Sequence, residues 1–130
     1  MKKKTVFDFR TIKSFDDACK KLGIDPKALP DVSMISEEFR KALIAAYKLF
    51  IIFKSINDGW DADFTNSHQV KYFPWLRVNS AGSGFDFSGS DYGCDITLTS
   101  VGSRLCTDTS EKAIYISEQF REEYADFFLK

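Results

Sequence analysis

Five side chains with oxygen or nitrogen donor atoms stand close together in one short segment. They are Asp58, Asp61, Asp63, Asn66 and His68. A hard cation such as Ca²⁺ takes several oxygen ligands from one turn of this kind. Their order lacks the carboxylate spacing, the central glycine and the closing glutamate of a calcium loop. We therefore expect polar turn residues and helix caps here, and no metal site.

The cysteines are the other groups that could react, and their spacing does not favour chemistry. Cys19, Cys94 and Cys106 form no CxxC pair, and His68 is the single histidine of the chain. A Cys₃His zinc site usually contains ligands paired a few residues apart, which this sequence lacks. No local motif supports a thiol nucleophile with His68 as its base. We expect structural thiols, no cofactor, no catalytic residue and no enzymatic activity.

Aromatic side chains give the strongest indication of binding. They gather at Trp60, Phe64, Tyr72, Phe73, Trp75, Phe85, Phe87 and Tyr92. Side chains alternate along a strand, so Tyr72 should lie on one face and Phe73 and Trp75 on the other. Since only one face can cover the core, some of these rings should be exposed or covered by another chain.

Three uses of these rings remain open. Beside Lys71, Arg77 and Arg104, they could stack the unpaired bases of a single-stranded nucleic acid. They could instead bind a protein partner or a second copy of the chain, or they could complete the core. The candidate binding residues are Trp60, Lys71, Tyr72, Phe73, Trp75, Arg77 and Arg104.

The distribution of charge limits the choice of partner. The 130 residues have a formal net charge of −1, but residues 1–57 carry +5 and residues 58–130 carry −6. The acidic second half opposes a phosphate backbone, which needs a positive track. Two oppositely charged layers within one fold explain this division. A basic surface on the first half that meets an acidic partner or a phosphate backbone is the alternative.

Neither a secretory signal nor a membrane span is expected. The cluster Lys2, Lys3 and Lys4 is followed by no apolar stretch of the length that a signal needs. The most apolar segment covers residues 42–53, whereas a bilayer span needs about 20 residues. Together with an odd number of cysteines, this predicts a cytoplasmic protein that does not bind membranes.

Two helices should precede these candidate residues. Ser14 can cap a helix over residues 15–22, and Gly23 supplies a left-handed stop. A second helix should start after Ser33 or Ser36 and run to about Ile56. Because residues 42–53 are apolar on nearly every face, this helix should be the buried centre of the core. Its Phe50 should be fully buried, so Phe50→Ala should cost roughly 3–5 kcal/mol.

Strands and a final helix should follow. Strands are expected at residues 70–78, 84–88, 92–99 and 103–107, with the first at an edge or broken at Pro74. A last helix should begin at Asp108, which has capping-box spacing to Glu111. The prediction is one α+β domain over residues 1–130, divided into a helical half (1–57), a sheet (58–108) and a C-terminal helix (109–130). A small antiparallel sheet of three to four strands would pack on the buried central helix, with the N- and C-terminal helices flanking it.

Several short segments carry a resemblance to known sequences. They are SFDDACKKLGI at residues 14–24, LPDV at 29–32, NDGW at 57–60, KYFPW at 71–75 and VGSRLC at 101–106. In this order they resemble a family of short uncharacterised proteins encoded by phages, prophages and other mobile elements of gut anaerobes. The family has no established activity, so it implies a genomic setting but no functional residues. We therefore expect an accessory protein that binds a protein partner or itself, with single-stranded nucleic-acid binding as the alternative.

Overall fold

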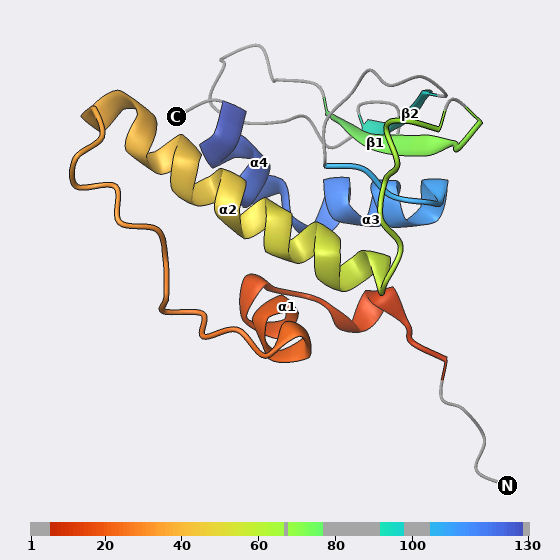
Figure 1. Cartoon of the computed structure of the whole chain (residues 1–130), viewed down its shortest axis with the longest axis horizontal. Coiled ribbons are helices and arrows are strands. Elements are labelled where there is room, and N and C mark those ends of the chain that lie inside the picture. The colour runs from red at the N-terminus through yellow and green to blue at the C-terminus, as the bar shows by residue number, and fades with distance from the viewer. Residues whose placement is uncertain (1–5, 67, 77–91, 98–104, 129–130) are drawn as a thin grey trace, which may run out of the picture.

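The computed structural model describes residues 6–66, 68–76, 92–97 and 105–128, and for residues 75–76 and 92–97 it describes the backbone alone. Within these ranges the chain forms a small, mostly helical domain (Figure 1). Its helices are the 3₁₀-helix η1 (Phe9–Thr11) and the α-helices α1 (Phe15–Leu22), α2 (Glu37–Asn57), α3 (Ser110–Gln119) and α4 (Arg121–Phe128). The predicted α+β fold with a sheet of three to four strands is wrong.

The strand structure of the described residues is a narrow ribbon. β1 (Lys71–Leu76) pairs antiparallel with β2 (Tyr92–Thr97), and β1 continues through Pro74. Tyr72 and Thr107 also exchange two backbone hydrogen bonds and form an isolated bridge. Of the strand expected at residues 103–107, the described residues show this bridge alone. The expected strand at 84–88 lies outside the described residues. The ribbon packs against α3 and does not cover α2 as the predicted sheet would.

Local signals place α1 where the sequence predicts it. The backbone N–H of Asp17 donates to Ser14 Oγ at 3.2 Å, which satisfies one of the free donors at the start of the helix. Gly23 ends the helix in the left-handed conformation, with φ of 70°. Ala18 and Cys19 are buried against the core. The prediction of a helix over residues 15–22 is confirmed.

Helix α2 also has the predicted extent; its end, from Ile51 to Asn57, is buried on nearly every side, but its earlier turns have an exposed face. Leu49, Ile52 and Ile56 are buried between α1 and α4, the helices that pack against α2. Phe50 is 41% exposed, so the expectation that it is fully buried is wrong. The prediction of a buried central helix required a sheet over the face of α2 that carries Phe50. Because the ribbon packs on α3 instead, that face keeps exposed apolar side chains.

The C-terminal segment forms two helices where one was predicted. Thr109, rather than Asp108, caps α3, because its hydroxyl accepts from the backbone N–H of Lys112 at 3.3 Å. Helix α3 ends at Phe120, and the chain continues directly into α4. The break lets α3 support the strands while α4 packs along α2.

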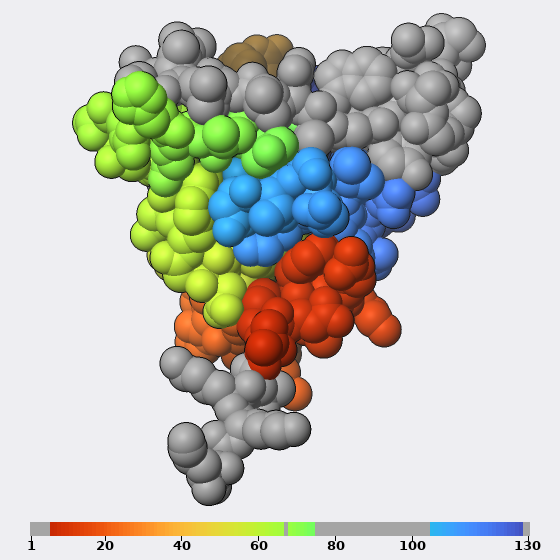
Figure 2. All heavy atoms as spheres, turned by 90° about the vertical axis from the view of Figure 1, so that its right-hand side faces the viewer, coloured from red at the N-terminus to blue at the C-terminus, as the bar shows by residue number. Residues whose placement is uncertain are grey.

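Long-range contacts join α3 to the start of the chain. The hydroxyl of Tyr115 donates to the carbonyl of Ile12 at 2.8 Å, and Gln119 Nε2 donates to the carbonyl of Lys13 at 2.8 Å. Figure 2 shows the surface of α3 between the segment that leads into β1 and the segment of η1 and α1. The core gathers where these elements meet, and it includes Phe15, Phe53, Ile116, Phe120 and Tyr124. Among the described helices, none has the length and hydropathy to cross a membrane.

Candidate functional site

A cavity of about 430 Å³ opens where α2 ends, and we call it the Trp60 pocket. One wall is the last two turns of α2, and the opposite wall is the loop that follows the helix. Four aromatic rings line it, together with two charged side chains, one amide and one thiol. The lining residues are Phe50, Phe53, Lys54, Asn57, Trp60, Asp61, Ala62, Phe64 and Cys106.

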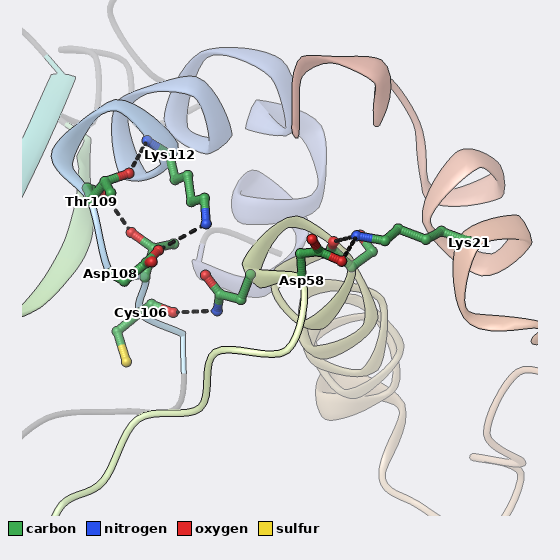
Figure 3. Close-up of polar contacts among 9 residues, drawn as sticks. Lys21, Asp58, Cys106, Asp108, Thr109 and Lys112 are labelled. Carbon is green, nitrogen blue, oxygen red and sulfur yellow. Dashed lines mark hydrogen bonds and ion pairs between the residues drawn. The ribbon is translucent and has the colours of Figure 1, made fainter. Parts of the chain in front are cut away.

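Contacts at the end of α2 fix the position of this loop. Asp58 ends the helix in the left-handed conformation, with φ of 46°. Lys21 Nζ from α1 donates to the carbonyl of Ser55 at 2.7 Å and to Asp58 Oδ1 at 2.8 Å (Figure 3). The backbone N–H of Trp60 then donates to the carbonyl of Asn57 at 3.0 Å, which turns the chain back toward the helix.

Gln69 holds the far end of the same loop. Its Oε1 accepts from the backbone N–H of Asp63 at 2.6 Å, and its Nε2 donates to the carbonyl of Asp61 at 3.2 Å. Hydrogen bonds from Thr65 lower the pKa of the Asp63 carboxyl. Of the polar residues expected to form turns and caps, Asp63 accepts from Thr65 and Asn66 accepts from the backbone N–H of His68 within the loop, while Asp58 contacts α1. Among the described residues, no three His, Cys, Asp or Glu side chains are grouped to hold a metal ion.

Asn57 is the buried polar residue of the Trp60 pocket. It is 7% exposed, and its Nδ2 donates to the carbonyl of Cys106 at 2.9 Å, a contact drawn in Figure 3. Its Oδ1 is buried and has no hydrogen-bond partner among the described residues. A buried acceptor without a donor is unfavourable and uncommon in folded proteins. Among the described residues, this oxygen is the one buried side-chain polar atom without a hydrogen-bond partner.

The cysteines are placed as structural groups. Cys19 and Cys106 are buried free thiols, and the side chain of Cys94 lies outside the described residues. Burial raises the pKa of the Cys106 thiol to about 11. The thiol is therefore protonated at neutral pH and is a poor nucleophile. His68, which no local motif supported as a base for a thiol, is exposed in the loop.

Lys71, a candidate for phosphate contact, lies inside the molecule. Its side chain is 0% exposed, and its Nζ donates to the carbonyls of Asn66 and Gln69 at 3.4 and 3.3 Å. The same ammonium lies 5.2 Å from the centre of the Phe64 ring. Arg77 and Arg104 lie outside the described residues. The described part of the chain therefore presents none of the three predicted cations on a surface beside the rings.

A second cavity of about 430 Å³ lies on the other side of Phe50, and we call it the Phe73 pocket. It is almost wholly apolar and lies between β1, α2 and α4. Its lining residues are Phe50, Phe73, Pro74, Leu105, Tyr124, Phe127 and Phe128. Phe50 lines both pockets.

The predicted aromatic residues do not form one face. Trp60 lines one pocket and Phe73 lines the other, while Tyr72 is half-buried at the bridge to Thr107. The side chain of Trp75 lies outside the described residues. Sequence reasoning missed Asn57 as a site residue. The available signal was a lone amide four residues after Phe53, where the apolar face of the helix would continue.

Family models, curated proteins and solved structures were all compared with this chain, and none matches. The site is therefore interpreted from its own geometry.

The exposed face of α2 is the remaining feature that could bind a partner. Phe39 is 54% exposed and Leu43 is 44% exposed, and they lie on the same face as Ala46 and Phe50. We call these four residues the α2 stripe. The first and the last of them are 11 positions apart, or about 16 Å along the helix. Exposed apolar side chains that form a continuous row are typical of contact surfaces.

Proposed function

We propose that this protein acts by binding, and that its α2 stripe pairs with the same stripe on a second copy of the chain. The observation that carries the proposal is the exposure of Phe39, Leu43 and Phe50 in one row on a long helix. Contact between two copies would remove these side chains from water, which is the main driving force for association.

The spacing of the stripe suits another helix. Phe39, Leu43, Ala46 and Phe50 are separated by four, three and four residues. This alternation matches the apolar positions of a heptad repeat, in which side chains of one helix fit between those of the next. The small Ala46 leaves room for a large side chain from the facing helix.

Charge favours an antiparallel arrangement of the two copies. Glu37 and Glu38 lie exposed at the start of α2, and Lys54 lies exposed near its end. If Phe39 of one copy faces Phe50 of the other, the acidic start of each helix comes close to Lys54 of its partner. The same surface then serves on both copies, as two-fold symmetry requires.

The expected genomic setting is compatible with this activity. The resemblance noted above implies an accessory protein of a phage or another mobile element, and a self-associating binding module without catalysis is consistent with such a role. We place the protein in the cytoplasm, because Cys19 and Cys106 are buried as free thiols, which suit a reducing compartment.

Sedimentation velocity over a wide concentration range tests the proposal. The wild-type chain is expected to sediment as a dimer, and Leu43→Glu is expected to weaken dimerisation at least about a hundredfold by placing a charge in the contact. Leu29→Glu is the matched control, because Leu29 is 40% exposed and lies off the stripe. A monomeric wild type, or a Leu43→Glu variant that dimerises as well as Leu29→Glu, would contradict the proposal.

A further inference from the structure

We infer that the Trp60 pocket of one copy is filled by Met34 and Ile35 of the second copy, so that each protomer completes a site on the other. This inference rests on the pairing of α2 stripes proposed above and names the residues that extend it. It concerns the segment just before α2 and the loop just after it, neither of which belongs to the stripe itself.

The α2 stripe leads directly into the pocket. Phe53 and Asn57 follow Phe50 by three and seven positions, so they continue the alternation of three and four residues that defines the stripe. All three residues line the Trp60 pocket. The pocket therefore lies in line with the stripe, where the loop after α2 folds beside the last turns of the helix. A chain that pairs along the stripe meets the pocket next.

The antiparallel pairing places residues 34 and 35 at this point. Both helices rise by about 1.5 Å per residue, so the arrangement that sets Phe39 of one copy opposite Phe50 of the other also sets residue 35 level with Lys54. Met34 lies one residue further out, at the level of the last turn of α2. Lys54 lines the pocket, so both apolar side chains arrive at its mouth.

Met34 projects from a segment that is already held in place. Arg40 Nε donates to the carbonyl of Ile35 at 2.7 Å, and Arg40 Nη2 donates to the carbonyl of Ser33 at 3.1 Å. The backbone N–H of Ile35 also donates to the carbonyl of Val32 at 3.0 Å, which closes a turn. Met34 is nevertheless 94% exposed. Because its backbone is fixed, its insertion into a partner costs little ordering of the chain.

The chemistry of the pocket suits these side chains. Trp60, Phe64, Phe53 and Phe50 line it, and a methionine sulfur makes favourable contacts with aromatic rings. The unbranched methionine side chain also adapts to irregular gaps. An apolar cavity of roughly 150 Å³ already admits a benzene ring, so the pocket of about 430 Å³ has room for both side chains.

Met34 cannot reach the pocket of its own chain. Helix α2 has 21 residues and is therefore about 30 Å long, and Met34 precedes it whereas the pocket lies at its end. Figure 1 shows the start of α2 far from the loop that leads to β1. The occupant must come from another chain. Charge favours a second copy, because Glu37 and Glu38 follow Met34 closely and would come near the exposed Lys54 at the rim.

Photochemical cross-linking of the full chain tests the inference. The photoreactive residue p-benzoylphenylalanine replaces Met34, and chains labelled with ¹⁵N are mixed with unlabelled chains so that links between copies are identified by mass. Links from position 34 to residues 50–64 of the other copy are expected. The same replacement at Leu29, which lies off the stripe and is 40% exposed, is the control and should give no links to these residues.

The outcomes separate this inference from the proposed dimer. A wild type that is monomeric in sedimentation contradicts both. A dimer in which position 34 gives no link to residues 50–64 of the other copy, or in which position 29 links to them equally well, overturns the inference and leaves the pairing of the stripes intact.

Paired substitutions give a second test that needs no cross-link. Met34→Ala and Trp60→Leu are each expected to weaken dimerisation about tenfold, and the double variant is expected to lose little more than either, because the two side chains contact each other. Leu29→Ala should leave dimerisation unchanged. Circular dichroism establishes that the variants are folded. Losses that multiply to about a hundredfold in the double variant, or a folded Met34→Ala that dimerises like wild type, overturn the inference.

Discussion

The ammonium group of Lys21 lies 2.8 Å from a carboxylate oxygen of Asp58, and this contact joins α1 to the residue at which α2 ends. The same ammonium donates to the carbonyl of Ser55 and lies 3.1 Å from the centre of the Phe7 ring. These interactions of one side chain join the N-terminal segment and α1 to the end of α2, where the loop of the Trp60 pocket begins.

Removal of this group should measurably destabilise the fold. Lys21→Met is expected to lower the free energy of unfolding by about 1–2 kcal/mol, because it leaves the carbonyl of Ser55 without its donor. Lys20 lies in the same turn but is exposed. Lys20→Met should therefore change the free energy of unfolding by less than about 0.5 kcal/mol. Urea melts of the two variants provide the comparison, and equal losses would show that the contact is unimportant.

Two phenylalanines of α2 should differ in their contribution to stability. Phe53 is 2% exposed and packs against Tyr124, so Phe53→Ala should cost about 3–5 kcal/mol. Phe50→Ala should cost no more than about 2 kcal/mol, because much of that ring already contacts water. Denaturant melts at a protein concentration that keeps the chain monomeric test this difference. The reverse order would mean that the buried face of α2 is assigned wrongly.

The cap of α3 gives a further test. Thr109→Ala should cost about 1 kcal/mol, because it removes the acceptor for the Lys112 N–H. Asp108→Ala removes an ion pair of 2.9 Å with the Lys112 side chain and should cost only about 0.5 kcal/mol. Thermal melts of both variants provide the comparison. A larger loss of stability in Asp108→Ala than in Thr109→Ala would identify Asp108 as the cap.

Stability should fall in alkaline solution. Burial raises the pKa of Cys106 to about 11, whereas an unfolded thiol titrates near 8.5. The folded chain therefore holds this proton more tightly, so the stabilisation is complete below about pH 8.5 and is lost as the pH rises through about 11. Burial raises the pKa of Tyr124 as well, in the same direction. Urea melts at neutral pH and near pH 10 should show a smaller alkaline loss for Cys106→Ala than for wild type; identical losses would exclude Cys106 as a contributor.

The features that the sequence predicted correctly depend on nearby residues. The bounds of α1 follow from Ser14 and Gly23, and both lie within one residue of the helix. The end of α2 likewise follows from the turn residues at Asp58 and Gly59. Interactions within one or two turns decide such features, so a single sequence contains the information.

The wrong predictions depend on which elements meet in space. The apolar row from Phe39 to Phe50 has the pattern of a core helix, but the described strands pack on α3, and Phe39, Leu43 and Phe50 remain exposed. Lys71 looked like a surface cation, but the loop folds over it and supplies two carbonyls. Asn57 became a site residue only through Cys106, 49 positions later.

The bonds from Tyr115 and Gln119 to the carbonyls of Ile12 and Lys13 cross 103 and 106 positions of the chain. During synthesis on a ribosome, α1 and α2 are made well before the helices that cover them. At usual rates of about 5–20 residues per second, the apolar face around Leu49 and Ile52 remains uncovered for several seconds until α4 has been synthesised. The nascent chain thus passes through a stage at which its future interior is open to chaperones and to neighbouring polypeptides.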